Sequence, residues 1–111
     1  MKLVLAIVQD DDAMDLIEEL TDKNFRVTKL ATTGGFLKSG NTTLMIGVEK
    51  EVVKDVVKVI EDVCKRRKEM VSTPAQTTIG SGSGMYMTYP IEVEVGGATV
   101  FVLDVDQFYK V

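Results

Sequence analysis

The first half of the chain alternates between apolar runs and segments in which apolar residues recur every three or four positions. Residues 2–9 are almost continuously apolar and predict a strand at the centre of a sheet. The acidic residues that follow open a predicted helix, which ends at Lys23 and Asn24 with a cation and a residue suited to the left-handed conformation. A second helix is predicted over residues 49–68, with Cys64 as a core residue on its apolar face and a basic run at its end.

The other apolar segments have the short length or the period of two that is typical of strands. They cover residues 25–31, 42–48, 89–95 and 98–103. A glycine pair, Gly96 and Gly97, predicts a tight hairpin turn between the last two. The order is β-α-β-β-α-β with one more strand, which predicts an α+β sandwich of two helices on an antiparallel sheet. At 111 residues the chain is predicted to be a single domain, residues 1–111.

Residues 71–91 contain no charged side chain and show neither helical nor strand periodicity. Their glycine and serine content predicts a flexible loop over about residues 70–88. The methionines and tyrosines near its end offer adaptable apolar surface. Such a loop is suited to closing on a ligand or meeting a partner protein.

A second loop, in residues 31–47, combines several glycines and threonines with one aromatic side chain. It lies in a window, residues 23–48, that has four basic and no acidic side chains, although the whole chain has a net charge of −4. Glycine lets backbone N–H groups approach an anion closely. The window therefore indicates an anionic small ligand, whereas the pI of about 4.8 argues against a nucleic-acid partner. Composition alone is equally compatible with a long hairpin turn.

The residue types that the chain lacks exclude several kinds of chemistry. There is no histidine, so an enzyme would have to use Asp, Glu, Lys or Tyr as its acid and base. The single cysteine excludes an internal disulfide and fits a reducing compartment. No apolar run approaches the roughly 20 residues of a membrane span, and the first run is too short for a secretory signal. We therefore expect a cytoplasmic protein without membrane insertion.

Two local patterns suggest sites that the chemistry does not support. The acidic residues 10–12 resemble part of a metal site, but capping and the dipole of the predicted helix explain them without a metal. Residues 35–42 have the glycine spacing of a P-loop, but Asn41 replaces the lysine that contacts phosphate and a strand follows in place of a helix. We reject a P-loop NTPase.

Several segments together resemble the PII-like cyclic di-AMP receptor family. They are residues 7–10, 24–26, 28–37, 40–43, 89–90 and 92–103. The resemblance implies a ferredoxin-like, PII-like homotrimer that binds three cyclic di-AMP molecules in clefts between neighbouring subunits. It also implies signal transduction without catalysis or a further cofactor, in which the nucleotide orders loops for an unknown downstream protein partner.

The resemblance assigns a set of residues to the ligand. They are Asn24, Arg26, Thr28, Gly35, Phe36, Leu37, Asn41, Gly47 and Phe101. Arg26 and Thr28 share one face of their strand and are candidates for phosphate or ribose contact. The N–H groups of residues 35–37 are candidates for an anion nest.

The remaining assignments concern the two adenines. Phe36 is a candidate stacking platform, and the amide of Asn41 matches an adenine edge. Gly47 would let a base approach the backbone, and Phe101 would reach the ligand of a neighbouring subunit. Three of them also have a structural interpretation: Phe36 as a loop anchor, Asn41 as a turn residue and Phe101 as core.

Three alternatives remain open at the level of the sequence. One is a PII-type regulator that senses ATP or ADP. Another is a small nucleotide-processing enzyme that uses Asp or Glu. The third is a constitutive trimeric scaffold whose loop binds only protein.

Overall fold

A computed structural model of the chain describes residues 1–30, 40–74 and 88–111. These residues divide into two compact units. The first comprises Met1–Lys65 with Gly96–Val111, and the second comprises Arg66–Val95. Each unit has a sheet of its own.

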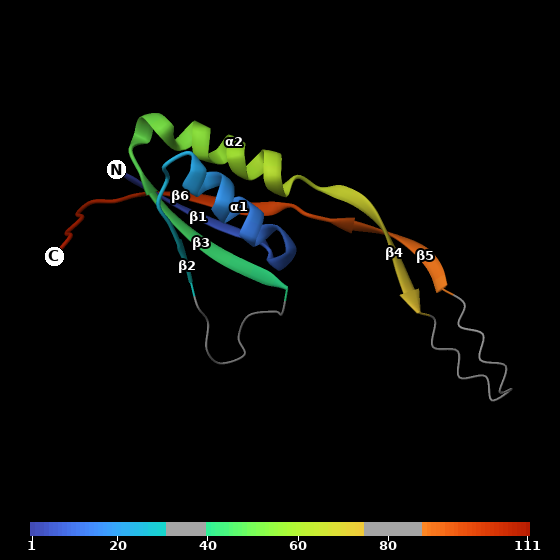
Figure 1. Cartoon of the computed structure of the whole chain (residues 1–111). Helices are drawn as coiled ribbons and strands as arrows, with labels where there is room; N and C mark the ends of the chain where they lie inside the picture. The colour runs from blue at the N-terminus through green and yellow to red at the C-terminus, as the bar shows by residue number, and fades with distance from the viewer. Residues whose placement is uncertain (31–39, 75–87) are drawn as a thin grey trace, which may run out of the picture. The chain divides into compact units, whose positions relative to one another are not determined.

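The first unit is a four-stranded antiparallel sheet covered on one face by two helices (Figure 1). Its elements are β1 (Lys2–Gln9), α1 (Asp10–Asp22), β2 (Val27–Lys29), β3 (Asn41–Val48), the 3-10 helix η1 (Lys50–Val52), α2 (Val53–Cys64) and β6 (Ala98–Asp104). The strand order is β2-β3-β1-β6. The predicted α+β fold, ferredoxin-like with two helices on an antiparallel sheet, is confirmed.

The core lies between the sheet and the two helices. Alternate residues of β1 and β3, among them Val4, Ala6, Leu44 and Ile46, are fully buried. The helices meet them with apolar residues spaced three and four apart, and Cys64 is buried there as predicted. β1 occupies the predicted central position, but the helices cover only one of its faces. Leu3, Leu5 and Ile7, on its other face, are only partly buried.

The end of α1 explains why β2 begins at Val27 and not at residue 25, where the predicted strand begins. Asn24 adopts the left-handed conformation, with φ of 67°, as its position after the helix predicts. The Phe25 N–H donates to the Leu20 carbonyl, at 2.9 Å, so this group serves the helix end and not the sheet. Pairing with β3 therefore begins at Val27, opposite Ile46.

The second unit corrects two predictions. Residues 65–68 do not end a helix, because α2 stops at Cys64 and β4 (Arg67–Pro74) starts three residues later. Residues 70–74 and residue 88 are not loop, because β4 pairs antiparallel with β5 (Thr88–Val95) along its whole length. The strand predicted over residues 89–95 is β5, which begins one residue earlier. The rest of that predicted loop, residues 75–87, lies outside the described residues.

Ion pairs with β5 accompany the change of the basic run from the predicted helix end to β4 and the residue before it. Arg66 lies 3.8 Å from Glu94, and Lys68 lies 3.7 Å from Glu92, measured between side-chain nitrogen and oxygen. Opposite charges at neighbouring cross-strand positions stabilise a sheet. Local periodicity could not show this, since the acidic partners are more than 20 residues away along the chain.

Candidate ligand-binding face of the sheet

The four-stranded sheet has an open face, defined here as the face opposite α1 and α2. Successive strand residues point to opposite faces, so the residues that alternate with the buried ones form it. The strand register aligns Thr28, Met45, Leu5 and Phe101 in one row across all four strands. The next row contains Gly47, Leu3 and Leu103. This face is largely apolar, and Phe101 is 51% exposed on it.

Five of the predicted ligand residues map to the open face. Thr28 lies on β2, and Arg26 lies just before it on the same side, since Val27 between them packs against the core. Asn41 is the first residue of β3 and Gly47 is the last but one, and both are on its open-face side. At the usual rise of a strand they are about 20 Å apart. Phe101 is on β6. All five are exposed.

The other four predicted residues are placed differently. Asn24 follows α1 in the left-handed conformation, and its N–H donates to the Thr21 carbonyl at 2.9 Å. That contact gives Asn24 a role in ending the helix. Gly35, Phe36 and Leu37 lie outside the described residues.

Thr28 and Phe101 lie on opposite edges of the sheet, because β2 and β6 are its two outer strands. Three strand spacings separate them, which amounts to about 14 Å. One small ligand on β2 is therefore out of easy reach of the Phe101 ring in the same chain. The sheet of one chain therefore does not bring Phe101 together with Thr28.

Gly47 is a glycine that the subunit itself does not require. Among the described residues, no atom lies within 4 Å of a Cβ built at this position, and the φ of Gly47 lies outside the left-handed range. Glycine in the middle of a strand weakens the strand and often marks close approach of a ligand or another backbone. The described residues therefore leave open space beside Gly47 on β3.

A set of hydrogen bonds at the junction of β1 and α1 was missed from the sequence. The Asp10 N–H donates to the Gly40 carbonyl at 2.8 Å, and the Thr42 hydroxyl donates to the Asp10 carboxylate at 2.5 Å. Next to them, the Gln9 side-chain oxygen accepts from the Gly96 N–H at 2.7 Å. The proximity of these residues could have been inferred from antiparallel pairing of β1 with β3.

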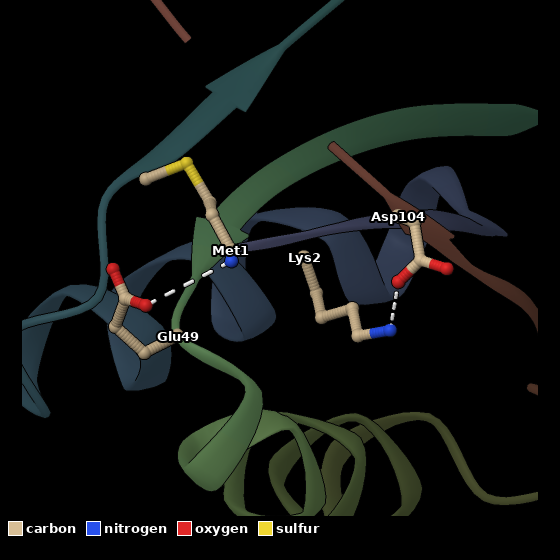
Figure 2. A network of polar contacts seen from close by, with 4 residues as sticks. All are labelled: Met1, Lys2, Glu49 and Asp104. Carbon is tan, nitrogen blue, oxygen red and sulfur yellow. Dashed lines mark hydrogen bonds and ion pairs between the residues drawn. The ribbon is translucent and has the colours of Figure 1, made fainter. Parts of the chain in front are cut away.

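The opposite end of β1 carries ion pairs that belong to the fold and not to the candidate site (Figure 2). The Lys2 ammonium contacts the Asp104 carboxylate, and this hydrogen bond and charge lower the pKa of Asp104 below its usual value. The Met1 amino group lies 3.9 Å from the Glu49 carboxylate. Together these contacts tie the start of β1 to the end of β6 and to the segment after β3.

Other kinds of site find no support among the residues that the structure describes. No group of three or more Cys, Asp or Glu residues is arranged to hold a metal ion there. A hollow between α1 and α2, which includes Phe25 and Val59, contains none of the predicted ligand residues. Within the described ranges, no helix is long and apolar enough to cross a membrane.

Comparison with known proteins identifies the family. A family model described as "Cyclic-di-AMP receptor" matches residues 1–111. The chain belongs to this cyclic-di-AMP receptor family. It is also similar, at 51% identity and a TM-score of 0.76, to a crystal structure of a functionally unknown protein from Pediococcus pentosaceus ATCC 25745. The match covers 99% of this chain and 96% of that one.

Proposed function

We propose that this chain is a cyclic di-AMP-binding signal-transduction protein of the cytoplasm. The dinucleotide binds in clefts between the subunits of a homotrimer, and binding reorders loops that signal to a partner protein. The protein acts as a receptor and not as an enzyme. Its family, the cyclic-di-AMP receptor family, supports this proposal.

The observation that carries the proposal is that Arg26, Thr28, Asn41, Gly47 and Phe101 share the open face of the sheet. Their chemistry suits the ligand. A guanidinium and a hydroxyl pair with a phosphodiester, a carboxamide reads an adenine edge, and an aromatic ring stacks on a base. An unobstructed glycine lets a base approach the backbone.

The homotrimer is supported by the apolar character of the open face. Leu3, Leu5, Met45, Phe101 and Leu103 form adjacent rows on it, and the last two are about half exposed. Contiguous apolar patches on a protein surface usually mark an interaction site. Association through this face would also bring Phe101 of one subunit toward Thr28 of another.

Calorimetry on the full chain tests the proposed ligand. We expect saturable binding of cyclic di-AMP, at one site per subunit, and much weaker binding of cyclic di-GMP, ATP and ADP. Binding of ATP or ADP in its place would make the chain an energy-sensing PII-type regulator. No nucleotide binding at all would support the protein-binding scaffold.

Two further measurements test assembly and catalysis. Light scattering is expected to give three times the mass of one chain. Chromatography after incubation with cyclic di-AMP is expected to return intact ligand. A hydrolysed product would establish the enzyme alternative.

A further inference from the structure

Asp10 holds the chain on both sides of Asn41. Its backbone N–H donates to the carbonyl of Gly40, the residue before Asn41, at 2.8 Å. Its carboxylate accepts from the hydroxyl of Thr42, the residue after Asn41, at 2.5 Å. The backbone of Asn41 thus lies between two residues that are bonded to the same aspartate.

This anchor lies where the sheet pairing ends. The last two register pairs between β1 and β3 are Val8 with Thr42 and Gln9 with Asn41. Before them comes Gly40, with φ of 117°, a conformation that lets the chain leave in directions other residues do not permit. Asn41 is therefore the last paired residue at this end of β3. The contacts of Asp10 with Gly40 and Thr42 restrain the backbone beyond the paired residues.

The two side chains flanking the anchor face opposite ways. Thr42 is only 8% exposed and lies on the helix side, where Asp10 receives its hydroxyl. Asn41 is exposed on the open face. A hydrogen bond from a hydroxyl to an ionised carboxylate is short and strong compared with a neutral pair. The contact on the helix side therefore restrains the backbone next to Asn41, which lies on the open face.

Building on the proposed function, we propose that Asp10 is a positioning residue for adenine recognition and acts through Asn41. Asp10 does not touch the ligand in this assignment. It holds the Gly40–Thr42 segment so that the carboxamide of Asn41 is presented to the base in one orientation. The sequence-level role of Asp10, as an acid at the start of a helix, does not include this function.

The test is a double-mutant cycle in the full chain, measured by calorimetry with cyclic di-AMP and cyclic di-GMP. Asp10→Ala is expected to weaken cyclic di-AMP binding about three- to tenfold, the range of one net hydrogen bond, and to reduce the preference over cyclic di-GMP. In an Asn41→Ala background, Asp10→Ala is expected to have no further effect. Thr42→Val is expected to reproduce the loss, while Thr42→Ser keeps the hydroxyl and the affinity.

Asp11→Ala is the matched control, because Asp11 is also exposed in the first turn of α1. If Asp10→Ala and Asp11→Ala behave alike, or if the Asp10 and Asn41 effects add, the positioning role is wrong. If Asp10→Ala does not fold, Thr42→Val and Thr42→Ser, each with and without Asn41→Ala, test the positioning role in its place. Failure of the unmodified chain to bind cyclic di-AMP would instead overturn the proposed function and this inference with it.

Discussion

Thr28 and Phe101 end the same cross-strand row on opposite edges of the sheet, with Met45 and Leu5 between them. Their separation of about 14 Å means that a cleft containing both takes each from a different subunit. Mixing two inactive variants therefore tests the origin of Phe101. Mixed trimers of Arg26→Ala and Phe101→Ala chains are expected to regain some tight cyclic di-AMP sites, measured by calorimetry after refolding together.

The control mixes Arg26→Ala with Thr28→Ala chains. Arg26 and Thr28 lie two residues apart on one edge, so each cleft takes both from the same subunit and no intact site forms. Equal recovery in the two mixtures, or none in either, would contradict a cleft completed by Phe101 of a neighbour.

Gly47→Ala separates ligand binding from folding. Because no atom lies within 4 Å of a Cβ at this position, we expect thermal unfolding of the variant at or slightly above the original temperature. If a base approaches the backbone at Gly47 as proposed, the methyl group occupies its space, and the affinity for cyclic di-AMP is expected to fall at least tenfold.

Gly40→Ala is the contrasting variant, since Gly40 has a φ of 117° that strains any other residue. It is expected to lower the unfolding temperature. A Gly47→Ala chain that unfolds early, or one that binds normally, would show that Gly47 serves the fold alone or nothing at all.

Asn24 carries both a structural and a predicted ligand role, and two substitutions distinguish them. Asn24→Gly tolerates the φ of 67° and is expected to leave the unfolding temperature nearly unchanged, whereas Asn24→Ala is expected to cost about 1 kcal/mol. If the side chain also contacts the ligand, calorimetry will show weakened binding for both variants. Normal binding by Asn24→Gly would restrict Asn24 to ending the helix.

The Lys2 and Asp104 contact predicts a pH dependence of stability. The pKa of Asp104 is lowered in the folded chain, mainly by the hydrogen bond and charge of Lys2. The stabilisation is therefore present above the unfolded pKa of about 3.9 and is lost as the pH falls through the lower folded value. Asp104→Asn is expected to lower the unfolding temperature slightly at pH 7, and this difference is expected to disappear as the pH falls through the lowered pKa of Asp104.

Salt provides the check on that assignment. Asp104 is fully exposed, so high salt is expected to remove most of the difference between the two proteins at pH 7. A difference that persists at high salt and at low pH would mean that Asp104 acts through something other than its charge.

The fold was predictable wherever local patterns decide the structure. Apolar spacing alone located β1, α1 and β3, and the Gly96 and Gly97 pair located the break between β5 and β6. The predicted hairpin of these two strands is wrong, because β5 pairs with β4 and β6 pairs with β1. β4 was missed because its residues have no period of their own and become a strand only by pairing with β5, about 20 residues later. Patterns within a short sequence segment cannot show that a strand is stabilised by pairing with a distant segment.

The candidate site was likewise predictable only where local patterns determine it. Alternation along β2 and β3 was enough to place Arg26 with Thr28, and their joint position on the open face follows from it. The contact from Thr42 to Asp10 depends on the register of β1 against β3, which no local pattern specifies. The ligand contacts of all nine predicted residues stay predictions.

β1 contributes side chains to two different surfaces of the sheet. Val4, Ala6 and Val8 fill the core beneath the helices, while Leu3, Leu5 and Ile7 form the centre of the open face. Six of its eight residues therefore lie either in the core or on the open face. Substitutions in β1 are therefore expected to disturb either the core or the open face, although none of its residues is a predicted ligand residue.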